Sequence, residues 1–560
     1  MTQTHRVGGL SYATGPTTSE LDESTVYRVL RRSALRDPDR LAIIEHESGR
    51  TWTYAEFHGA VDRCATGLYA AGVRPGDRVG IWSANRAEWV LVQFATARLG
   101  AILVTINPAY RADELGYALC KVQVSTLISA LGFRGVSYRE LLEQVRRDCP
   151  DLTTVIELDT SGWDAVASGV GEYEAAVAEI DGTLSADDPI NIQFTSGTTG
   201  APKGATLSHR GIVNNARYFG EGLRYTPADR VCVPVPLYHC FGMVMGSLCT
   251  AYHGATMILP GPWFDPAKTL QAVAEHRCTS LYGVPTMFIA ELDVLANSDL
   301  DIASLRTGIM GGSPCPVEIM RRVITELGMD EITICFGMTE NSPVATQTKL
   351  DDDLRRRTET VGVPMPHMEI SVRDPLTNAL VPYGVVGDAC FRAYSVMLGY
   401  WQDAERTAAV LDDDGWLHTG DLAVMDEDGY LSVVGRLKDM VIRGGENIYP
   451  REIEECLIAH PDVTDVQVVG VPDERMGEEL MAWLVIRPGA VPLDADTVRV
   501  FCETRLSPQK IPRYVRVVDD FPMTVTGKVR KNVIRELAVE ELRRHQRTGL
   551  MAPVCAVKEP

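Results

Sequence analysis

The stretch from Thr195 to Gly204 reads TSGTTGAPKG. It holds three glycines, four hydroxyl side chains and one lysine, Lys203. Residues 189–194 (PINIQF) alternate apolar and polar side chains before it, which predicts a strand. Glycines let a backbone approach a ligand closely, while free N–H groups, hydroxyls and a lysine charge suit phosphate oxygens. The stretch therefore predicts a phosphate-binding loop that follows a strand.

This loop differs from the Walker A loop, in which Gly-Lys-Ser/Thr follows four free positions. Here Lys203 is followed by Gly204. The alternative is a flexible surface loop, the usual fate of a run rich in glycine, serine and threonine. The preceding strand, the single lysine and the lack of repetition favour phosphate binding.

The length and charge of the chain restrict the classes of protein to which it can belong. Its 560 residues exceed what one hydrophobic core accommodates, so two or more domains are expected. Hydrophobic residues make up 45% and charged residues 23%, as in an ordinary globular protein. The net charge of −21 argues against nucleic acid as a partner and against charge-driven docking on an anionic membrane.

Cysteine usage and the N-terminus predict a cytoplasmic protein. The 13 cysteines are odd in number and form no Cys-x-x-Cys pair, so we expect reduced, mostly buried thiols. Residues 1–15 show no signal peptide. Residues 231–264 carry no Asp, Glu, Lys or Arg, but prolines and glycines interrupt them. We expect a buried strand–loop–helix–strand there and no transmembrane segment, with peripheral membrane contact and a dimer left open.

Hydrophobic periodicity predicts alternating strands and helices before the loop. Expected helices cover 24–38, 54–72, 88–99 and 111–121. Expected strands cover 41–44, 50–54, 78–82, 101–106 and 125–129, the first two as a hairpin. Such alternation with short connections indicates an α/β fold with mainly parallel sheets covered by helices.

The pattern continues after the loop. We expect helices at 209–222 and 266–276, strands at 231–234 and 256–259, and a turn at 237–242. Three further strands, at 279–283, 306–310 and 331–335, each run into a glycine-containing turn. Because ligands bind beyond the carboxyl ends of strands in open α/β sheets, these turns are expected to face one crevice.

The sequence pattern changes near residue 361. Short strands and Asp-rich turns predict a small β-rich subdomain over 361–437. Further on, helices at 449–459 and 494–505 and strands at 466–471, 479–486 and 513–518 predict a compact α+β module. We therefore expect an N-terminal domain of residues 1–437 and a small mobile C-terminal domain of residues 438–560, with a loose tail from about 552.

Seven motifs occur in a fixed order along the chain. They are 195–204, GGSP (311–314), FGMTE (336–340), WLHTGD (416–421), GRLKD (435–439), GGENIYP (444–450) and TVTGK (524–528). Together they resemble the adenylate-forming superfamily over about residues 24–540. PLYHCFG (236–242), TENSPV (339–344) and IRGGENIYP (442–450) look most like the fatty acyl-CoA ligases, in particular acyl-CoA synthetase family member 2 and its bacterial relatives.

The resemblance implies a two-step reaction. A carboxylate attacks the α-phosphate of ATP to give acyl-AMP and pyrophosphate, and the thiol of CoA then displaces AMP. The resemblance assigns catalysis to Lys528, Glu340, Thr339 and His239, with Lys528 bridging the carboxylate and the α-phosphate. Glu340 and Thr195 are the implied Mg²⁺ ligands. The alternatives are a solvated lysine for Lys528, a turn carboxylate for Glu340 and a structurally satisfied imidazole for His239.

The resemblance also implies an ATP/AMP site. Its residues are Thr195, Ser196, Gly197, Thr198, Thr199, Gly200, Lys203, Gly312, Ser313, Pro314, Phe336, Asp421 and Arg436. Asp421 is expected to accept hydrogen bonds from the ribose hydroxyls and Arg436 to donate to ribose or phosphate. The alternatives are a helix-cap or turn role for Asp421, a surface ion pair with Asp439 for Arg436, and simple packing for Phe336.

The second step requires the C-terminal domain to rotate. Lys438 matches the hinge, and Gly444 and Gly445 match the strip that lies beside the pantetheine of CoA, where a side chain would block approach. A plain β-turn is the alternative for these glycines. The uncharged stretch 231–264 is expected to line the acyl chain, and its glycines and methionines favour an aliphatic acid.

The sequence thus predicts an ATP-, Mg²⁺- and CoA-dependent ligase for a medium- to long-chain fatty acid. Three other functions stay open. The substrate could be an aryl or other carboxylic acid, the acceptor could be a separate carrier protein, or the chain could be a nucleotide-binding regulatory module without ligase activity.

Overall fold

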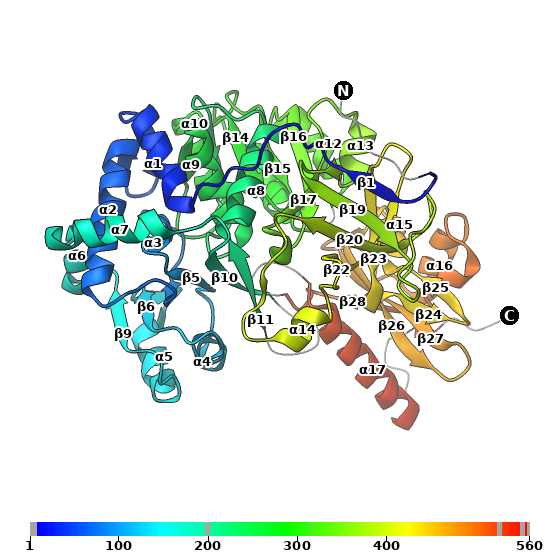
Figure 1. Cartoon of the computed structure of the whole chain (residues 1–560). Coiled ribbons are helices and arrows are strands. Elements are labelled where there is room, and N and C mark those ends of the chain that lie inside the picture. The colour runs from blue at the N-terminus through cyan, green and yellow to red at the C-terminus, as the bar shows by residue number, and fades with distance from the viewer. Residues whose placement is uncertain (1–7, 196–201, 314, 524–528, 549–554, 557–560) are drawn as a thin grey trace. The chain divides into compact units, whose positions relative to one another are not determined.

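The computed structural model describes residues 8–195, 202–313, 315–523, 529–548 and 555–556. The chain forms two compact units, whose elements are labelled in Figure 1. The first comprises Met1–Ser371, Cys390–Thr419 and Asp426–Leu431, and the second Val372–Ala389, Gly420–Met425 and Ser432–Pro560. Both combine helices with sheets, which confirms the predicted α/β class.

A seven-stranded sheet in the first unit carries the predicted phosphate loop. Its order is β21-β11-β10-β5-β4-β6-β9, parallel from β10 to β9, with β11 antiparallel to both of its neighbours. The strands are β4 (Arg78–Trp82), β5 (Ile102–Ile106), β6 (Thr126–Ser129), β9 (Thr154–Glu157), β10 (Pro189–Thr195), β11 (Lys203–Ser208) and β21 (Gly399–Tyr400). Every residue of β5 is buried, as expected for a central parallel strand between layers of helices.

A nine-stranded sheet forms the rest of the first unit's core. Its order is β18-β17-β16-β15-β14-β12-β13-β2-β3, parallel from β16 to β2. The strands are β2 (Leu41–Glu45), β3 (Thr51–Thr53), β12 (Arg230–Cys232), β13 (Thr256–Leu259), β14 (Ser280–Gly283), β15 (Thr307–Met310), β16 (Glu331–Gly337), β17 (Val344–Gln347) and β18 (Val363–Pro364). Because β14, β15 and β16 are parallel neighbours, their carboxyl ends lie along one edge, as the sequence predicted.

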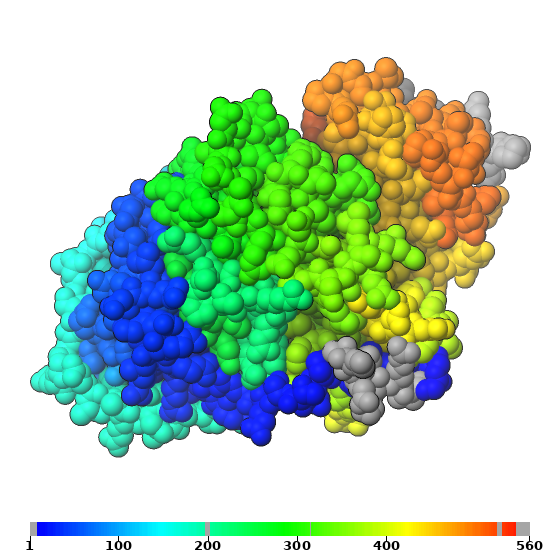
Figure 2. Space-filling model, turned by 90° about the horizontal axis from the view of Figure 1, so that it is seen from above, coloured from blue at the N-terminus to red at the C-terminus, as the bar shows by residue number. Residues whose placement is uncertain are grey.

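Helices connect and cover these strands (Figure 1). They are α1 (Val26–Arg36), α2 (Tyr54–Ala70), α3 (Ala87–Arg98), α4 (Ala112–Lys121), α5 (Tyr138–Val145), α6 (Ser161–Ser168), α7 (Glu174–Thr183), α8 (His209–Gly222), α9 (Cys249–His253), α10 (Pro266–Glu275), α11 (Pro285–Leu295), α12 (Val317–Glu326), α13 (Leu354–Glu359) and α14 (Ala404–Ala408). The N-terminal segment, dark blue in Figure 2, lies against green parts of the chain. Asp22 N–H donates to Asn214 Oδ1 over 2.7 Å, and Asn214 Nδ2 donates back to the Asp22 carbonyl.

Short strands dominate residues 361–437, as predicted. Besides β18 they include β19 (Met368–Arg373), β20 (Gly387–Ala393), β22 (Leu417–Met425) and β23 (Leu431–Arg436). Near the N-terminus, β1 (Tyr12–Thr14) pairs with β19 in antiparallel register, with Tyr12 opposite Ser371. The chain passes from one unit to the other within β19, β20, β22 and β23.

The second unit contains a compact C-terminal sheet. Its order is β25-β24-β27-β28-β29, and β26 pairs with β27. The elements are β24 (Val441–Arg443), β25 (Glu446–Ile448), α15 (Pro450–Ile458), β26 (Val463–Asp473), β27 (Gly477–Ile486), α16 (Ala495–Glu503), β28 (Tyr514–Val518), α17 (Lys531–Thr548) and β29 (Cys555–Ala556). Alternating residues of β26 enter two cores, because Val468 packs with Ile453 of α15 whereas Val469 packs with Ile534 of α17.

Several elements differ from the predictions. The sequence pattern did not predict β11, and the predicted turn at 237–242 runs into a π-helix, η3, over Phe241–Leu248. Helices α5, α6, α7, α11, α12 and α17 were also not predicted. No disulfide bond joins the cysteines for which the structure describes side chains, in line with the expected thiols.

Candidate functional site

The phosphate-loop stretch connects the two strands of an antiparallel hairpin. Thr195 at the end of β10 lies opposite Lys203 at the start of β11, so these two predicted site residues face each other across the neck of the loop. The predicted phosphate contacts Ser196, Gly197, Thr198, Thr199 and Gly200 lie outside the described residues. Tyr117 of α4 donates a hydrogen bond to the Pro202 carbonyl over 2.8 Å, which ties the neck to a helix.

The predicted Mg²⁺ carboxylate, Glu340, lies in a buried turn. A 3₁₀ turn over Thr339–Asn341 holds it, and Ser342 ends this turn with a positive φ of 67°. Glu340 is 5% exposed. Its Oε1 accepts a hydrogen bond from the Tyr400 hydroxyl over 2.7 Å, and its carbonyl accepts from Met397 N–H over 2.8 Å. A buried, oriented carboxylate of this kind fits a divalent cation better than a solvated turn residue would.

Tyr400 was not predicted as a site residue, yet it joins two that were. It belongs to β21, which pairs with β11, and the Lys203 ammonium lies 4.7 Å from the centroid of its ring. Burial, together with the neighbouring Glu340 carboxylate, raises the pKa of Tyr400 far above its ordinary value, so the hydroxyl stays protonated and donates. Tyr400 lies 60 positions after Glu340 and outside every motif used above, so the sequence pattern could not connect the two residues.

His239 has a defined tautomer. Its Nδ1 accepts a hydrogen bond from Phe241 N–H over 3.1 Å, and Cys240 Sγ lies 3.5 Å from the same nitrogen. A neutral imidazole with this acceptor carries its proton on Nε2. Thr339, the residue before Glu340, places Oγ1 3.7 Å from Cys240 Sγ. The structure therefore brings the predicted residues His239 and Thr339 to either side of Cys240.

The predicted acyl-lining stretch contains the buried π-helix η3. All of its residues from Phe241 to Leu248 are buried, and a Cβ added at Gly242 would meet the Pro236 carbonyl oxygen at 2.3 Å. π-helical segments are rare and are frequently found at functional sites. Side chains bond to its carbonyls: Ser247 Oγ of the same helix donates to Met243 O over 2.7 Å, and Tyr282 of β14 donates to Met245 O over 3.1 Å.

The predicted adenine walls lie at neighbouring strand ends. Gly312 follows β15 with φ at +85°, and Ser313 after it is exposed. Phe336, near the end of β16, is half-buried and meets Phe391 edge to face with ring centroids 5.7 Å apart. Pro314 lies outside the described residues. Since β15 and β16 are adjacent, the structure brings Ser313 and Phe336 to one edge of the sheet.

The remaining predicted residues belong to the second unit. Arg436 Nε lies 2.8 Å from Asp421 Oδ1, and Asp421 is 7% exposed. The structure thus pairs Arg436 with another predicted site residue. Lys438 lies in a 3₁₀ turn over Leu437–Asp439. The predicted catalytic Lys528 lies outside the described residues.

Gly444 and Gly445 form a two-residue hairpin loop. They connect β24 to β25, in which Arg443 lies opposite Glu446, and both have positive φ, 59° and 86°. Such a turn requires positive φ at both positions, which explains two successive glycines. Arg443 beside them forms an ion pair of 2.8 Å with Glu479, which is 1% exposed.

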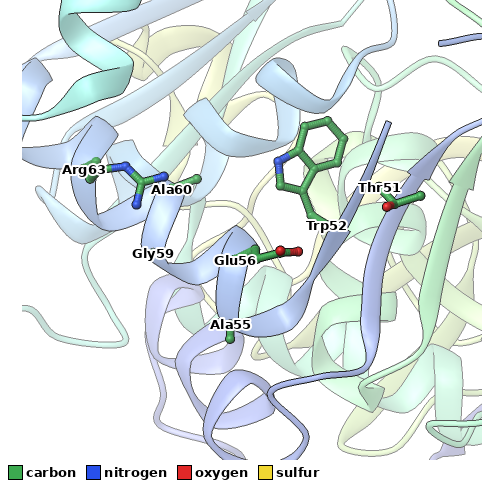
Figure 3. Close-up of a pocket in the computed structure, with 7 residues that line it drawn as sticks. All are labelled: Thr51, Trp52, Ala55, Glu56, Gly59, Ala60 and Arg63. Atoms are coloured by element: carbon green, nitrogen blue, oxygen red, sulfur yellow. The ribbon is translucent and has the colours of Figure 1, made fainter. Parts of the chain in front are cut away.

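Two other polar features lie apart from these residues. A hollow of about 380 Å³ beside α2 is lined by Thr51, Trp52, Ala55, Glu56, Gly59, Ala60 and Arg63 (Figure 3). None of the predicted site residues lines it, and its Glu56 serves the capping box of α2 with Thr53. His46 and His276 already share a hydrogen bond of 3.2 Å beside Glu275. Neither feature offers the chemistry of the predicted reaction.

Comparisons with known proteins cover nearly the whole chain. The medium-chain acyl-CoA ligase ACSF2, mitochondrial, of Danio rerio is 43% identical over 95% of this chain and 91% of its own length. ATP-bound MatB from Rhodopseudomonas palustris has a TM-score of 0.83 and 33% identity, over 92% of this chain and 99% of that one. The anthranilate CoA ligase AuaEII in complex with anthranoyl-AMP has a TM-score of 0.82 and 26% identity, over 93% and 98%.

The family comparison covers most of the chain. The AMP-binding enzyme family matches residues 30–401, and the AMP-binding enzyme C-terminal domain matches residues 452–528. No helix within the described ranges combines the length and apolar character that crossing a membrane requires. These matches agree with the hairpin that carries the predicted phosphate loop and with the buried Glu340 turn. The chain therefore belongs to the AMP-binding, adenylate-forming enzymes.

Proposed function

We propose that this protein is a fatty acid–CoA ligase that activates its substrate as an acyl-AMP. The observation that carries the proposal is the buried Glu340 carboxylate, which Tyr400 connects to the strand that leaves the phosphate loop. The similarity to a medium-chain acyl-CoA ligase supports a fatty acid as the substrate, and the similarity to a CoA ligase that holds an acyl-AMP supports the intermediate.

In the first step, a carboxylate oxygen of the acid forms a bond to the α-phosphorus of ATP, and the bond to pyrophosphate breaks. Lys528 is proposed to lie between the two anions and to stabilise the charge of the transition state. Glu340 and Thr195 are proposed to hold Mg²⁺, which when bound neutralises phosphate charge. Residues 196–200 and Lys203 are proposed to grip the phosphates until pyrophosphate leaves.

The contacts to the nucleoside are proposed from the sequence resemblance. Asp421 accepts hydrogen bonds from the ribose hydroxyls, and Arg436, which already orients Asp421, donates to ribose or phosphate. Gly312, Ser313, Pro314 and Phe336 form the walls of the adenine site.

In the second step, the CoA sulfur attacks the acyl carbon and AMP leaves with the bonding electrons. Lys438 is proposed as the hinge about which residues 438–560 turn, and the boundary between 437 and 438 remains a prediction. Gly444 and Gly445 are proposed to lie beside the pantetheine, where their missing side chains leave room.

The acid is proposed to lie along η3, with His239 beside its carboxylate. The helix contains Phe241, Met243 and Met245, whose flexible or aromatic side chains suit an aliphatic chain of medium to long length. Cytoplasmic location remains our expectation from the reduced cysteines, and a dimer and peripheral membrane contact remain open.

A panel of acids tests this function. Purified protein is given ATP, Mg²⁺, and fatty acids from short to long chain or aryl acids, with either CoA or an acyl-carrier protein. Pyrophosphate release and thioester formation are both measured. We expect turnover of medium- to long-chain acids with CoA, and a loss of at least about 100-fold in acyl-AMP formation for Lys528→Ala.

Two results would overturn the proposal. Thioester formation on the carrier protein alone would assign the protein to carrier loading. Unchanged acyl-AMP formation in Lys528→Ala would remove the mechanism, even if an acid is turned over.

A further inference from the structure

The segment from Val396 to Trp401 connects the Glu340 turn to the strand that leaves the phosphate loop. Met397 N–H donates to the Glu340 carbonyl over 2.8 Å. Leu398 N–H donates to Thr206 O over 2.9 Å, and Trp401 N–H to Gly204 O over 2.8 Å, both on β11. One short stretch of backbone therefore holds the carboxylate turn and the hairpin together.

The Tyr400 side chain makes the same connection through polar and charged groups. Its hydroxyl donates to Glu340 Oε1 over 2.7 Å, while its ring carries the Lys203 ammonium 4.7 Å from the centroid. Its backbone N–H is bonded to Thr407 Oγ1 over 2.9 Å, and the residue is 6% exposed, so the ring has little freedom to move.

This geometry has a consequence for the carboxylate. A hydrogen bond to Oε1 fixes the rotation of the carboxyl group and leaves Oε2 for a cation. Hydrogen bonds from an uncharged donor to a charged acceptor are among the stronger ones in proteins. Without the Tyr400 hydroxyl, Glu340 would have to be reoriented each time a cation binds.

We propose that Tyr400 is a positioning residue that aligns Glu340 for the divalent cation and Lys203 for the phosphates. This rests on the proposed ligase function and adds to it a physical connection between the metal carboxylate and the stem of the phosphate loop. Tyr400 acts through Glu340 and Lys203 and touches no reacting atom.

Two substitutions separate the two contacts. Tyr400→Phe removes only the hydroxyl and keeps the ring under Lys203. Tyr400→Leu removes both the hydroxyl and the ring. The matched control is Tyr430→Phe, because the Tyr430 hydroxyl also donates to a buried carboxylate, that of Asp352, which has no part in the proposed site.

The first measurement is pyrophosphate release with a medium-chain acid while free Mg²⁺ is titrated at fixed ATP. For Tyr400→Phe we expect the half-saturating Mg²⁺ concentration to rise about 10-fold to 100-fold, with the maximal rate largely recovered at high Mg²⁺. For Tyr400→Leu we expect an additional rise of about 2-fold to 5-fold in the ATP concentration for half-maximal rate. Tyr430→Phe should leave both values unchanged.

The second measurement does not depend on turnover. Binding of Mn²⁺ in the presence of a non-hydrolysable ATP analogue is followed by loss of the free Mn²⁺ signal in electron paramagnetic resonance. Tyr400→Phe should weaken Mn²⁺ binding by a similar factor, and Tyr430→Phe should not. Thermal unfolding of all variants shows whether each one is folded.

The outcomes separate this inference from the proposed function. If the wild-type protein releases pyrophosphate but Tyr400→Phe has the Mg²⁺ and Mn²⁺ dependence of the control, the positioning role is wrong while the ligase function stands. A uniform fall in rate at every Mg²⁺ concentration, with normal Mn²⁺ binding, also overturns it. If the wild-type protein activates no acid, the proposed function itself fails.

Discussion

Replacement of Glu291 by Gln is expected to stabilise the first unit, and increasingly so as the pH rises. Glu291 lies on α11, is fully buried, and has no hydrogen-bond partner for either carboxyl oxygen among the described residues. Burial without a partner disfavours the charged form, so the pKa of Glu291 is raised well above its ordinary value. The folded protein therefore holds a proton here that the unfolded chain releases.

The size of the effect follows from proton linkage. Above the ordinary glutamate pKa of about 4.3 the unfolded state binds one proton fewer than the folded state, so the free energy of unfolding falls as the pH rises. The slope is about 1.4 kcal/mol per pH unit until the pH reaches the raised pKa. While the pH stays below the raised pKa, the wild type should lose about 1.4 kcal/mol per pH unit that Glu291→Gln, which cannot ionise, retains.

Thermal unfolding of both proteins at pH 5.5, 6.5 and 7.5 measures this difference. With an unfolding entropy of about 2.1 cal/mol/K per residue and a unit of about 400 residues, 1.4 kcal/mol corresponds to about 1.7 °C per pH unit. Asp293→Asn, an exposed position on the same helix, is the control and should show no pH-dependent gap. A Glu291→Gln gap that stays constant or shrinks with rising pH would refute the reasoning.

Two further predictions concern the second unit. Gly445→Ala strains a turn at φ +86° by about 1–2 kcal/mol. It should slow thioester formation from added acyl-AMP while pyrophosphate release stays within about 2-fold of the wild-type rate. The control is Gly49→Ala, which places a similar strain on the β2–β3 turn at φ +68° and should change neither rate. Arg443→Met leaves the buried Glu479 carboxylate without its closest partner, which should destabilise the unit by about 3 kcal/mol. Hydrogen exchange of the β27 amides should then speed up, and unchanged protection would contradict this.

Much of the alternating architecture was readable from hydrophobic periodicity. The strand at 78–82 and the helix at 209–222 have the predicted bounds, and Ser208 caps that helix by accepting from Gly211 N–H. β11 was missed because its sequence, KGATLS, is small and polar, and its strand character comes from pairing with β10 and β21. A buried helix was predicted within 231–264, but neither the bounds nor the π type of η3 were, because a segment buried on every side has no periodicity to read.

The site was predictable only where a motif carried it. Thr195, Lys203 and Glu340 come from motifs, and the structure places the first two opposite each other. Tyr400 came from no motif, because its role depends on pairing with a strand far away in the sequence. Nothing in the sequence indicated that Glu291 is buried without a hydrogen-bond partner, since a glutamate in a helix is normally exposed.

The pairing of β21 with β11 also has a consequence for biosynthesis. Ala205 lies opposite Tyr400, so the outer edge of β11 stays uncovered until the ribosome has added almost 200 further residues. At about 5–20 residues per second this takes about 10–40 s. An open strand edge is a template for pairing with other chains during that interval. The nascent protein is therefore expected to need chaperone protection at the very hairpin that carries its phosphate loop.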